Sequence, residues 1–166
     1  MPPQIILIVG KSNSGKTTLV EKLIRELKAR QYTVGSVKHT HEQFEFDTAG
    51  KDSWRHRQAG ADATLVVTDS RVALVRDDDR PDLEKMRAYL DGTDIIIAEG
   101  FKTQDLPKIE IFRTGGPHSA PFCLEDPNLI ALVTDADLSP DVPVFGLEDT
   151  GKLADFIEST LPAGGR

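Results

Sequence analysis

Apolar residues follow two alternating spacings along this chain. Residues 5–9, IILIV, form an unbroken apolar run, which is typical of a strand buried on both faces of a parallel sheet. From residue 16 to about residue 30 the apolar positions recur every three or four residues, on one face of a helix. These positions are Leu19, Val20, Leu23, Ile24 and Leu27. The pattern therefore predicts a strand followed at once by an amphipathic helix.

Strand and helix patterns continue to alternate towards the C-terminus. They predict strands within 32–40, 94–101, 107–113, 129–135 and 142–147, and helices within 54–60, 80–92 and 150–161. Two β-rich runs within 63–78 are separated by four polar residues, which predicts an antiparallel hairpin inserted into the sheet. Residues 114–128 are rich in turn formers and predict a loop. The expected fold class is α/β, with a doubly wound, mostly parallel sheet and one hairpin.

Composition and charge limit the classes of protein and partner. Residues 1–166 are expected to form a single domain, because the chain has ordinary domain size and 39% hydrophobic residues. The net charge of −7 argues against nucleic acid, whose binding requires neutralised phosphates. The apolar N-terminal run is too short to span a membrane. The single cysteine, Cys123, is expected to be a small, partly buried residue, and it favours a cytoplasmic location because no internal disulfide can form.

Between the first strand and the first helix lies GKSNSGKT, residues 10–17, which matches the phosphate-loop pattern G-x-x-x-x-G-K-[ST]. Its glycines let backbone N–H groups turn towards phosphate oxygens, Lys16 adds a positive charge, and the Thr17 hydroxyl suits Mg²⁺. We therefore interpret the chain as a P-loop NTPase-like nucleotide-binding domain. The expected nucleotide-binding residues are Gly10, Ser12, Asn13, Ser14, Gly15, Lys16, Thr17 and Thr18.

Charged residues near predicted strand ends are the candidates for catalysis. Ligands of doubly wound sheets bind beyond the carboxyl ends of the strands, and Glu99 stands at such an end in IIIAEG. Thr17 and Glu99 are the expected Mg²⁺ ligands; the alternative for Glu99 is a buried acid paired with a basic side chain. Lys16, Asp47 and Glu99 are the expected catalytic residues. Asp47 either positions water or links to Mg²⁺, or it belongs to a solvated charged loop.

Other candidate site residues allow two interpretations each. His39 and His41 alternate along an extended segment and suit a shared anion or metal, but no third metal ligand is patterned. Asp135 follows the apolar run LIALVT and can accept hydrogen bonds from guanine N1 and N2, donors that adenine lacks, or it is a turn or cap residue. Lys11 either reaches across a dimer to a partner's nucleotide or is a solvated loop lysine.

Several segments in order give the chain a family resemblance. GKSNSGKTTL, KHTH, GKDSWRHRQAGA, AEGFK and PKIEIFR resemble the molybdopterin-guanine dinucleotide biosynthesis protein B family, over about residues 4–160. The resemblance implies a GTP-binding protein with weak GTPase activity, usually a homodimer. Its implied partner is the guanylyltransferase that joins the molybdenum cofactor to GMP, and a molybdopterin-type cofactor is a second ligand to consider. Lys51, Asp52 and Ser53 fall in the family's characteristic segment.

Two functions compete on these observations. The first is a GTP-binding adapter that assists the guanylyltransferase, with slow hydrolysis because no arginine or glutamine is clearly aimed at the transferred phosphoryl group. The alternative is a small-molecule kinase, which would need a lid carrying arginines over the phosphates. Contacts with a second copy or a partner are expected at the hairpin and at loop 114–128.

Overall fold

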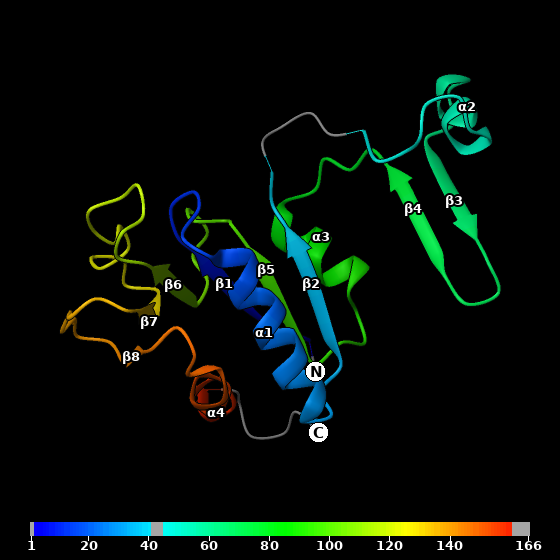
Figure 1. Cartoon of the computed structure of the whole chain (residues 1–166). Helices are drawn as coiled ribbons and strands as arrows, with labels where there is room; N and C mark the ends of the chain where they lie inside the picture. The colour runs from blue at the N-terminus through cyan, green and yellow to red at the C-terminus, as the bar shows by residue number, and fades with distance from the viewer. Residues whose placement is uncertain (1, 41–44, 161–166) are drawn as a thin grey trace. The chain divides into compact units, whose positions relative to one another are not determined.

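The computed structural model describes residues 2–40 and 45–160. They fall into two compact units, a first unit of residues 1–40 and 86–166 and a second unit of residues 41–85. Figure 1 labels the elements: β1 (Gln4–Val9), α1 (Lys16–Ala29), β2 (Val34–Lys38), α2 (Asp52–Gln58), β3 (Ala63–Val67), β4 (Val72–Arg76), α3 (Asp82–Tyr89), β5 (Ile95–Glu99), β6 (Lys108–Phe112), β7 (Leu129–Thr134), β8 (Val144–Phe145) and α4 (Thr150–Thr160). Every predicted strand and helix is therefore confirmed. A single domain over 1–166 stays a prediction.

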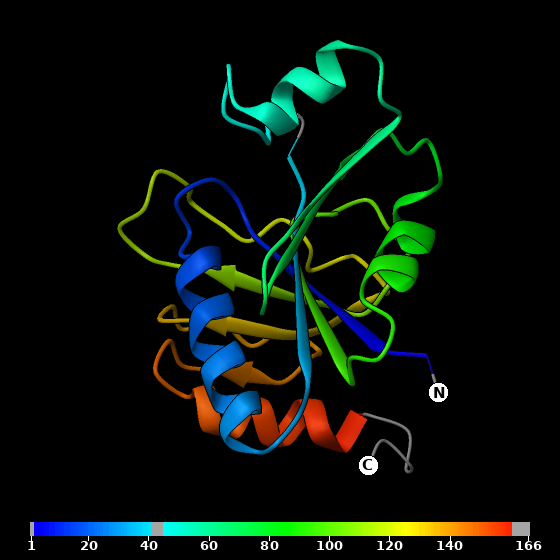
Figure 2. The same cartoon turned by 90° about the vertical axis from the view of Figure 1, so that its right-hand side faces the viewer.

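The first unit is built on a six-stranded sheet with the order β2-β5-β1-β6-β7-β8. All its strand pairs are parallel, which confirms the predicted α/β class. Figure 2 shows α1 and α4 on one face of this sheet. On the opposite face Leu90, next after α3, lies against Gly35 of β2. No described helix is long and apolar enough to cross a membrane.

The main hydrophobic core fills the space between the sheet and the helices α1 and α4. Alternate residues of the central strands face it, as the period of two in a strand requires. Packing in this core therefore decides which side chains of each strand point towards α1. Because side chains alternate along a strand, it also decides to which face the last side chain of each strand points. It contains Ile6, Ile8, Leu19, Val20, Leu23, Leu27, Ile95, Ile97, Ile109, Ile111, Ala131, Val133, Leu153, Ala154 and Ile157.

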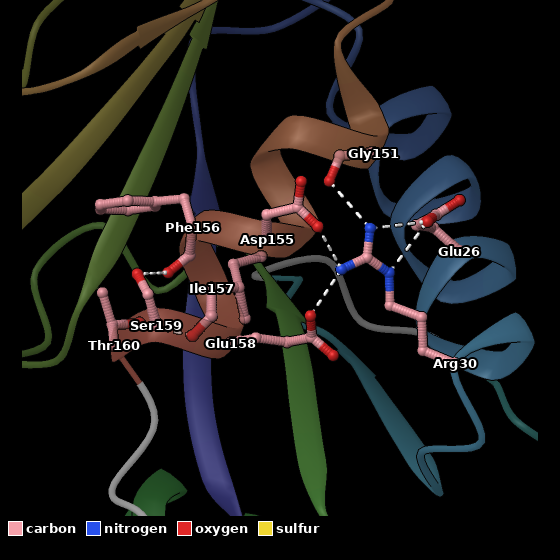
Figure 3. Close-up of polar contacts among 9 residues, drawn as sticks. All are labelled: Glu26, Arg30, Gly151, Asp155, Phe156, Ile157, Glu158, Ser159 and Thr160. Carbon is pink, nitrogen blue, oxygen red and sulfur yellow. Dashed lines mark hydrogen bonds and ion pairs between the residues drawn. The ribbon is translucent and has the colours of Figure 1, made fainter.

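Arg30, at the end of α1, connects this helix to α4 (Figure 3). Its guanidinium donates to Asp155 and Glu158 at 2.6 Å, to the Gly151 carbonyl at 3.0 Å and to Glu26 at 2.9 Å. The hydrogen bond to Asp155, followed by the other two carboxylates, raises the pKa of Arg30 still further above its already high value. A permanent positive charge thus fastens the last helix of the chain to the helix that carries the phosphate loop.

The face of β6 opposite α1 buries two charged residues. Lys108 forms an ion pair with Asp126, and the Glu110 carboxylate accepts the backbone N–H groups of Phe122 and Cys123 at 2.8 and 2.9 Å. These contacts hold loop 114–128 against the sheet, because a buried charge requires a partner. Cys123, which the sequence predicted to be partly buried, is buried in this loop.

The hairpin of the second unit differs from the prediction in its sheet. Strands β3 and β4 pair antiparallel with each other, but they form a separate two-stranded sheet and are not inserted into the parallel sheet. The expectation of a hairpin within the main sheet was therefore wrong. The physical reason is that the sequence spacing reports the pairing of β3 with β4 across a short turn, but not the pairing with a distant strand that joining the parallel sheet would require. Leu65, Val67, Val72 and Leu74 on this hairpin are exposed.

Candidate functional site

The carboxyl ends of four neighbouring strands meet at one edge of the parallel sheet. β2, β5, β1 and β6 lie side by side in that order, and they end at Lys38, Glu99, Val9 and Phe112. The phosphate loop therefore starts in the middle of this edge, between Glu99 on one side and the end of β6 on the other. Gly10 and His39 lie directly beyond the ends of β1 and β2, as predicted, whereas Glu99 is the last residue of β5 itself.

The backbone of the phosphate loop needs its glycines. A Cβ atom at Gly10 would lie 2.6 Å from the carbonyl oxygen of Ile111, a distance at which the backbone itself would have to move. Gly15 has φ 99° and ψ 15°, a left-handed conformation that favours glycine, and it is the residue before α1 begins at Lys16. The loop thus leads directly into the positive end of α1, where phosphate groups bind readily.

Lys16 is folded back onto the loop that carries it. Its Nζ donates to the carbonyl oxygens of Gly10 and Lys11 at 2.9 and 2.7 Å. Burial lowers the pKa of Lys16; the charge of Lys38 acts in the same direction, whereas Glu99 opposes both. Neutral carbonyl oxygens bind an ammonium group more weakly than a phosphate anion does. The Lys16 ammonium can therefore exchange these carbonyls for a phosphate bound at the same loop.

Glu99 is the buried acid of the site. Its carboxylate accepts hydrogen bonds from the Thr17 hydroxyl, with distances of 3.3 and 3.1 Å to its two oxygens, and it forms an ion pair with Lys38. The sequence left two interpretations of Glu99, a Mg²⁺ ligand or a buried acid paired with a basic side chain. The structure is compatible with both, since Glu99 contacts Thr17, the other expected metal ligand, and is also paired with a basic side chain. The strand register explains the ion pair, because Lys38 lies directly opposite Glu99.

These residues surround a hollow of about 480 Å³. That size falls within the usual range of small-molecule sites. Lys38 and Arg113 line it but were not among the expected site residues. The side chain of Arg113, which follows β6, lies beside Gly15. Lys38 ends β2 and Arg113 follows β6, but a single basic residue at such a position has no motif that identifies it. The hollow is lined by Ser12, Asn13, Gly15, Lys16, Thr17, Thr18, Lys38, Glu99 and Arg113.

The residues present fit a magnesium ion. Mg²⁺ prefers hard oxygen ligands and usually takes only one or two from the protein, with waters and substrate phosphates completing its shell. Thr17 and Glu99 bring a hydroxyl and a carboxylate together beside the phosphate loop. Elsewhere in residues 2–40 and 45–160, His, Cys, Asp and Glu side chains form no group of three that could hold a metal.

Asp135 follows β7 at the same edge of the sheet and is exposed. The backbone N–H of Thr114 donates to its Oδ1 at 2.7 Å, and this hydrogen bond, the largest of several causes, lowers the pKa of Asp135. Asp135 thus connects the residues after β6 and β7, in line with the turn interpretation, while a carboxylate has lone pairs for further donors. Whether it reads a base stays a prediction.

Asp47 and the residues around it belong to the second unit. The Asp47 carboxylate accepts hydrogen bonds from the Ser53 hydroxyl at 2.9 Å and from the Thr48 N–H at 2.8 Å. Lys51 and Asp52 stand at the start of α2. A catalytic role of Asp47 stays a prediction.

Of the two histidines, His41 lies outside the described residues. His39 belongs to the first unit. Its backbone N–H donates to the Glu99 carbonyl at 3.0 Å, and its ring lies 4.5 Å from that of Phe101, measured between centroids. These contacts fix the segment that follows β2 beside the buried acid.

A second, small cavity lies between the phosphate loop and loop 114–128. Its volume of about 10 Å³ leaves room for about one water molecule. In the described part of the chain, the Ser14 hydroxyl and the Nε2 atom of His118 are buried without a hydrogen-bond partner, and both residues line this cavity. Lys11 also borders it, which leaves its role across a dimer open.

Comparison with known proteins gives consistent matches. The family model "Molybdopterin guanine dinucleotide synthesis protein B" matches residues 5–135. Two relatives are each named "Molybdopterin-guanine dinucleotide biosynthesis adapter protein". The relative from Escherichia coli is 39% identical over 158 residues, which cover 92% of this chain and 90% of the relative. The relative from Haemophilus influenzae is 37% identical over 157 residues, which cover 93% and 87%.

Solved structures agree with these matches. The crystal structure of Bacillus subtilis MobB has a TM-score of 0.75 at 28% identity, covering 98% of this chain and 99% of that one. A second structure, described as molybdopterin-guanine biosynthesis protein B, has a TM-score of 0.74 at 26% identity and covers 95% and 99%.

Proposed function

Because the chain belongs to the molybdopterin guanine dinucleotide synthesis protein B family, we propose that it is a GTP-binding adapter in molybdopterin guanine dinucleotide biosynthesis. The relatives from E. coli and H. influenzae are named as adapters in this biosynthesis, and each match covers most of both chains. In this role the protein binds GTP with Mg²⁺ and assists the guanylyltransferase that joins the cofactor to GMP.

One observation carries the nucleotide-binding part of the proposal. The phosphate loop, the start of α1 and the Thr17 to Glu99 contact meet around one hollow at the carboxyl edge of the sheet. The loop supplies backbone donors, Lys16 supplies a charge, and Thr17 and Glu99 supply the metal ligands. The nucleotide-binding residues in this proposal are Gly10, Ser12, Asn13, Ser14, Gly15, Lys16, Thr17 and Thr18.

Hydrolysis in this proposal is weak. Lys16 balances charge on the phosphates, Glu99 acts with Mg²⁺, and Asp47 positions the attacking water. The Ser53 hydroxyl and the Thr48 N–H both donate to Oδ1 of Asp47, and the carboxylate has further lone pairs that can accept from a water molecule. Turnover in this proposal is slow until a partner completes the site, because transition-state charge is poorly compensated without a group aimed at the transferred phosphoryl.

Choice of guanine is assigned to Asp135. Its carboxylate stands after β7, two strands from the phosphate loop strand β1, and one oxygen is fixed by the Thr114 N–H. A fixed carboxylate can accept the paired N1 and N2 donors of guanine, and adenine has no such pair.

A homodimer joined by the hairpin is part of the proposal. Val67 and Val72, which lie opposite each other, are 63% and 70% exposed, and the neighbouring pair Leu65 and Leu74 is also exposed. A contiguous apolar face of this kind on a two-stranded sheet is typical of an interaction surface. A second copy supplies an identical apolar face, which makes a symmetric contact self-complementary.

The test compares GTP binding of the wild-type chain with that of Lys16→Ala in the presence of Mg²⁺. The variant should lose at least about tenfold in affinity, because one charge on the phosphates is removed. Lys22→Ala is the matched control, since Lys22 stands on the same helix but pairs with Glu148.

Addition of the guanylyltransferase should then give a complex and speed the formation of its product. Rapid phosphorylation of a metabolite by the chain alone would instead support the kinase alternative.

A further inference from the structure

Lys38 and Glu99 are the last residues of adjacent parallel strands and lie directly opposite each other in their register. Opposite residues point to the same face of a sheet, so the register itself brings the Lys38 ammonium to the Glu99 carboxylate. The Glu99 side chain is only 8% exposed, whereas that of Lys38 is 63% exposed. One partner is therefore buried and fixed, and the other reaches in from solvent.

A buried carboxylate needs a compensating charge. The ammonium groups of Lys16 and Lys38 both lie close to Glu99. The Lys16 ammonium instead donates to the carbonyl oxygens of Gly10 and Lys11. Lys38 is thus the residue that compensates Glu99 in the free chain.

In the proposed site, Thr17 and this same carboxylate bind Mg²⁺. Two cations, Mg²⁺ and the Lys38 ammonium, therefore compete for the Glu99 carboxylate. We propose that Lys38 is a built-in counter-ion, which holds Glu99 beside Thr17 while the divalent cation is absent and yields the carboxylate when Mg²⁺ and nucleotide bind. This inference rests on the proposed nucleotide site. It assigns Lys38 a positioning role, acting through Glu99, that the sequence patterns did not indicate.

Release of Lys38 costs little, because its flexible stem can return the ammonium to water. The free chain avoids an unpaired buried charge, and the metal must compete with the lysine for one carboxylate. Lys38 therefore sets the Mg²⁺ concentration at which nucleotide binding is strengthened.

The first test measures GDP affinity by calorimetry over a range of Mg²⁺ concentrations. Lys38→Met keeps most of the stem but removes the charge, and it should lower the half-saturating Mg²⁺ concentration about threefold or more. Lys38→Arg should remain near the wild type. Lys152→Met is the matched control, because Lys152 is similarly exposed and pairs with Asp149 away from the site. An unchanged midpoint in Lys38→Met would overturn the inference.

The second test uses thermal unfolding and needs no turnover. Lys38→Met should have a lower Tm than the wild type in EDTA, and this deficit should vanish with saturating Mg²⁺ and GDP. A deficit of equal size under both conditions would show a merely structural ion pair and contradict the proposal. Lys38→Gln carries the same test if Lys38→Met folds poorly.

The two proposals fail in different ways. A wild-type chain that binds neither GDP nor GTP would overturn both. A wild-type chain that binds nucleotide in a Mg²⁺-dependent way, together with an unaltered Lys38→Met variant, would overturn only the role of Lys38.

Discussion

The hydroxyl group of Thr17 donates to the carboxylate of Glu99, with distances of 3.3 and 3.1 Å to its two oxygens, although the residues lie 82 positions apart in the sequence. The contact joins the start of α1 to the end of β5. It places the two proposed metal ligands side by side before any ligand binds, so little rearrangement is needed for Mg²⁺ to enter.

Replacing Glu99 with glutamine tests this metal site. The amide keeps the shape of the side chain but removes the negative charge, so Mg²⁺ should no longer strengthen GTP binding, a loss of about tenfold or more. Calorimetry with and without Mg²⁺ measures the effect. Glu148→Gln, which alters the acid paired with Lys22 on the surface, should behave as the wild type. Equal Mg²⁺ dependence in Glu99→Gln would remove Glu99 from the metal site.

The hairpin should control the oligomeric state. Val67→Lys introduces a charge into the apolar face of β3 and should weaken a dimer by at least about tenfold, because the charge would have to be desolvated. Sedimentation analysis over a range of concentrations measures this change. Val144→Lys, at an exposed valine of the first unit, is the control. A dimer that survives Val67→Lys unchanged would place the contact elsewhere, and loop 114–128 would be the next candidate.

Cys123 should be an unreactive thiol in the folded chain. Burial, assisted by the negative charge of Glu110, raises its pKa from the ordinary 9.0 to about 11. At pH 8 the thiolate fraction is then about a hundredfold lower than for a free thiol, and access is also limited. Labelling with a thiol reagent should be slow in buffer and fast in denaturant. Equally rapid labelling in both would show that loop 114–128 does not protect the thiol.

The ion pair between Lys108 and Asp126 should stabilise the first unit. Lys108 is 2% exposed, so Asp126→Asn leaves its ammonium without a carboxylate and should lower the free energy of unfolding by about 3 kcal/mol. Chemical denaturation at neutral pH measures this loss, with the exposed Asp105→Asn as control. Retention of the full unfolding free energy would mean that water or backbone compensates Lys108.

The same pair gives stability a definite pH dependence. The hydrogen bond from Lys108 lowers the pKa of Asp126. A carboxyl group with a lowered folded-state pKa contributes stability that is present above its ordinary value and is lost as the pH falls through the folded value. The wild type should therefore lose stability below about pH 4, and this loss should be smaller in Asp126→Asn.

Local sequence patterns predicted the helices and strands well, because the apolar residues of this chain follow clear helix and strand spacings. The runs IILIV and IIIA have no polar interruption, and both lie in central strands of the sheet. The family resemblance is confirmed for the same reason, since its segments are local strings. The sheet membership of the hairpin was predicted wrongly, because it depends on pairing between distant strands, which periodicity does not report.

The candidate site was predictable only where a motif names its members. The phosphate loop and Glu99 were found from spacing and strand position. Lys38 and Arg113 were missed because a single basic residue after a strand has no pattern of its own. Their importance comes from strand order, which sets Lys38 opposite Glu99 and the end of β6 beside the phosphate loop.

Base preference is the most direct test of the central claim that the chain binds GTP. Calorimetry should compare GTP and ATP with Mg²⁺ on the wild type, on Asp135→Ala and on Asp137→Ala, which alters an exposed acid two positions later. We expect GTP to bind at least about tenfold more tightly than ATP to the wild type and to Asp137→Ala, and the preference to shrink in Asp135→Ala. Equal or tighter binding of ATP by the wild type would contradict the claim.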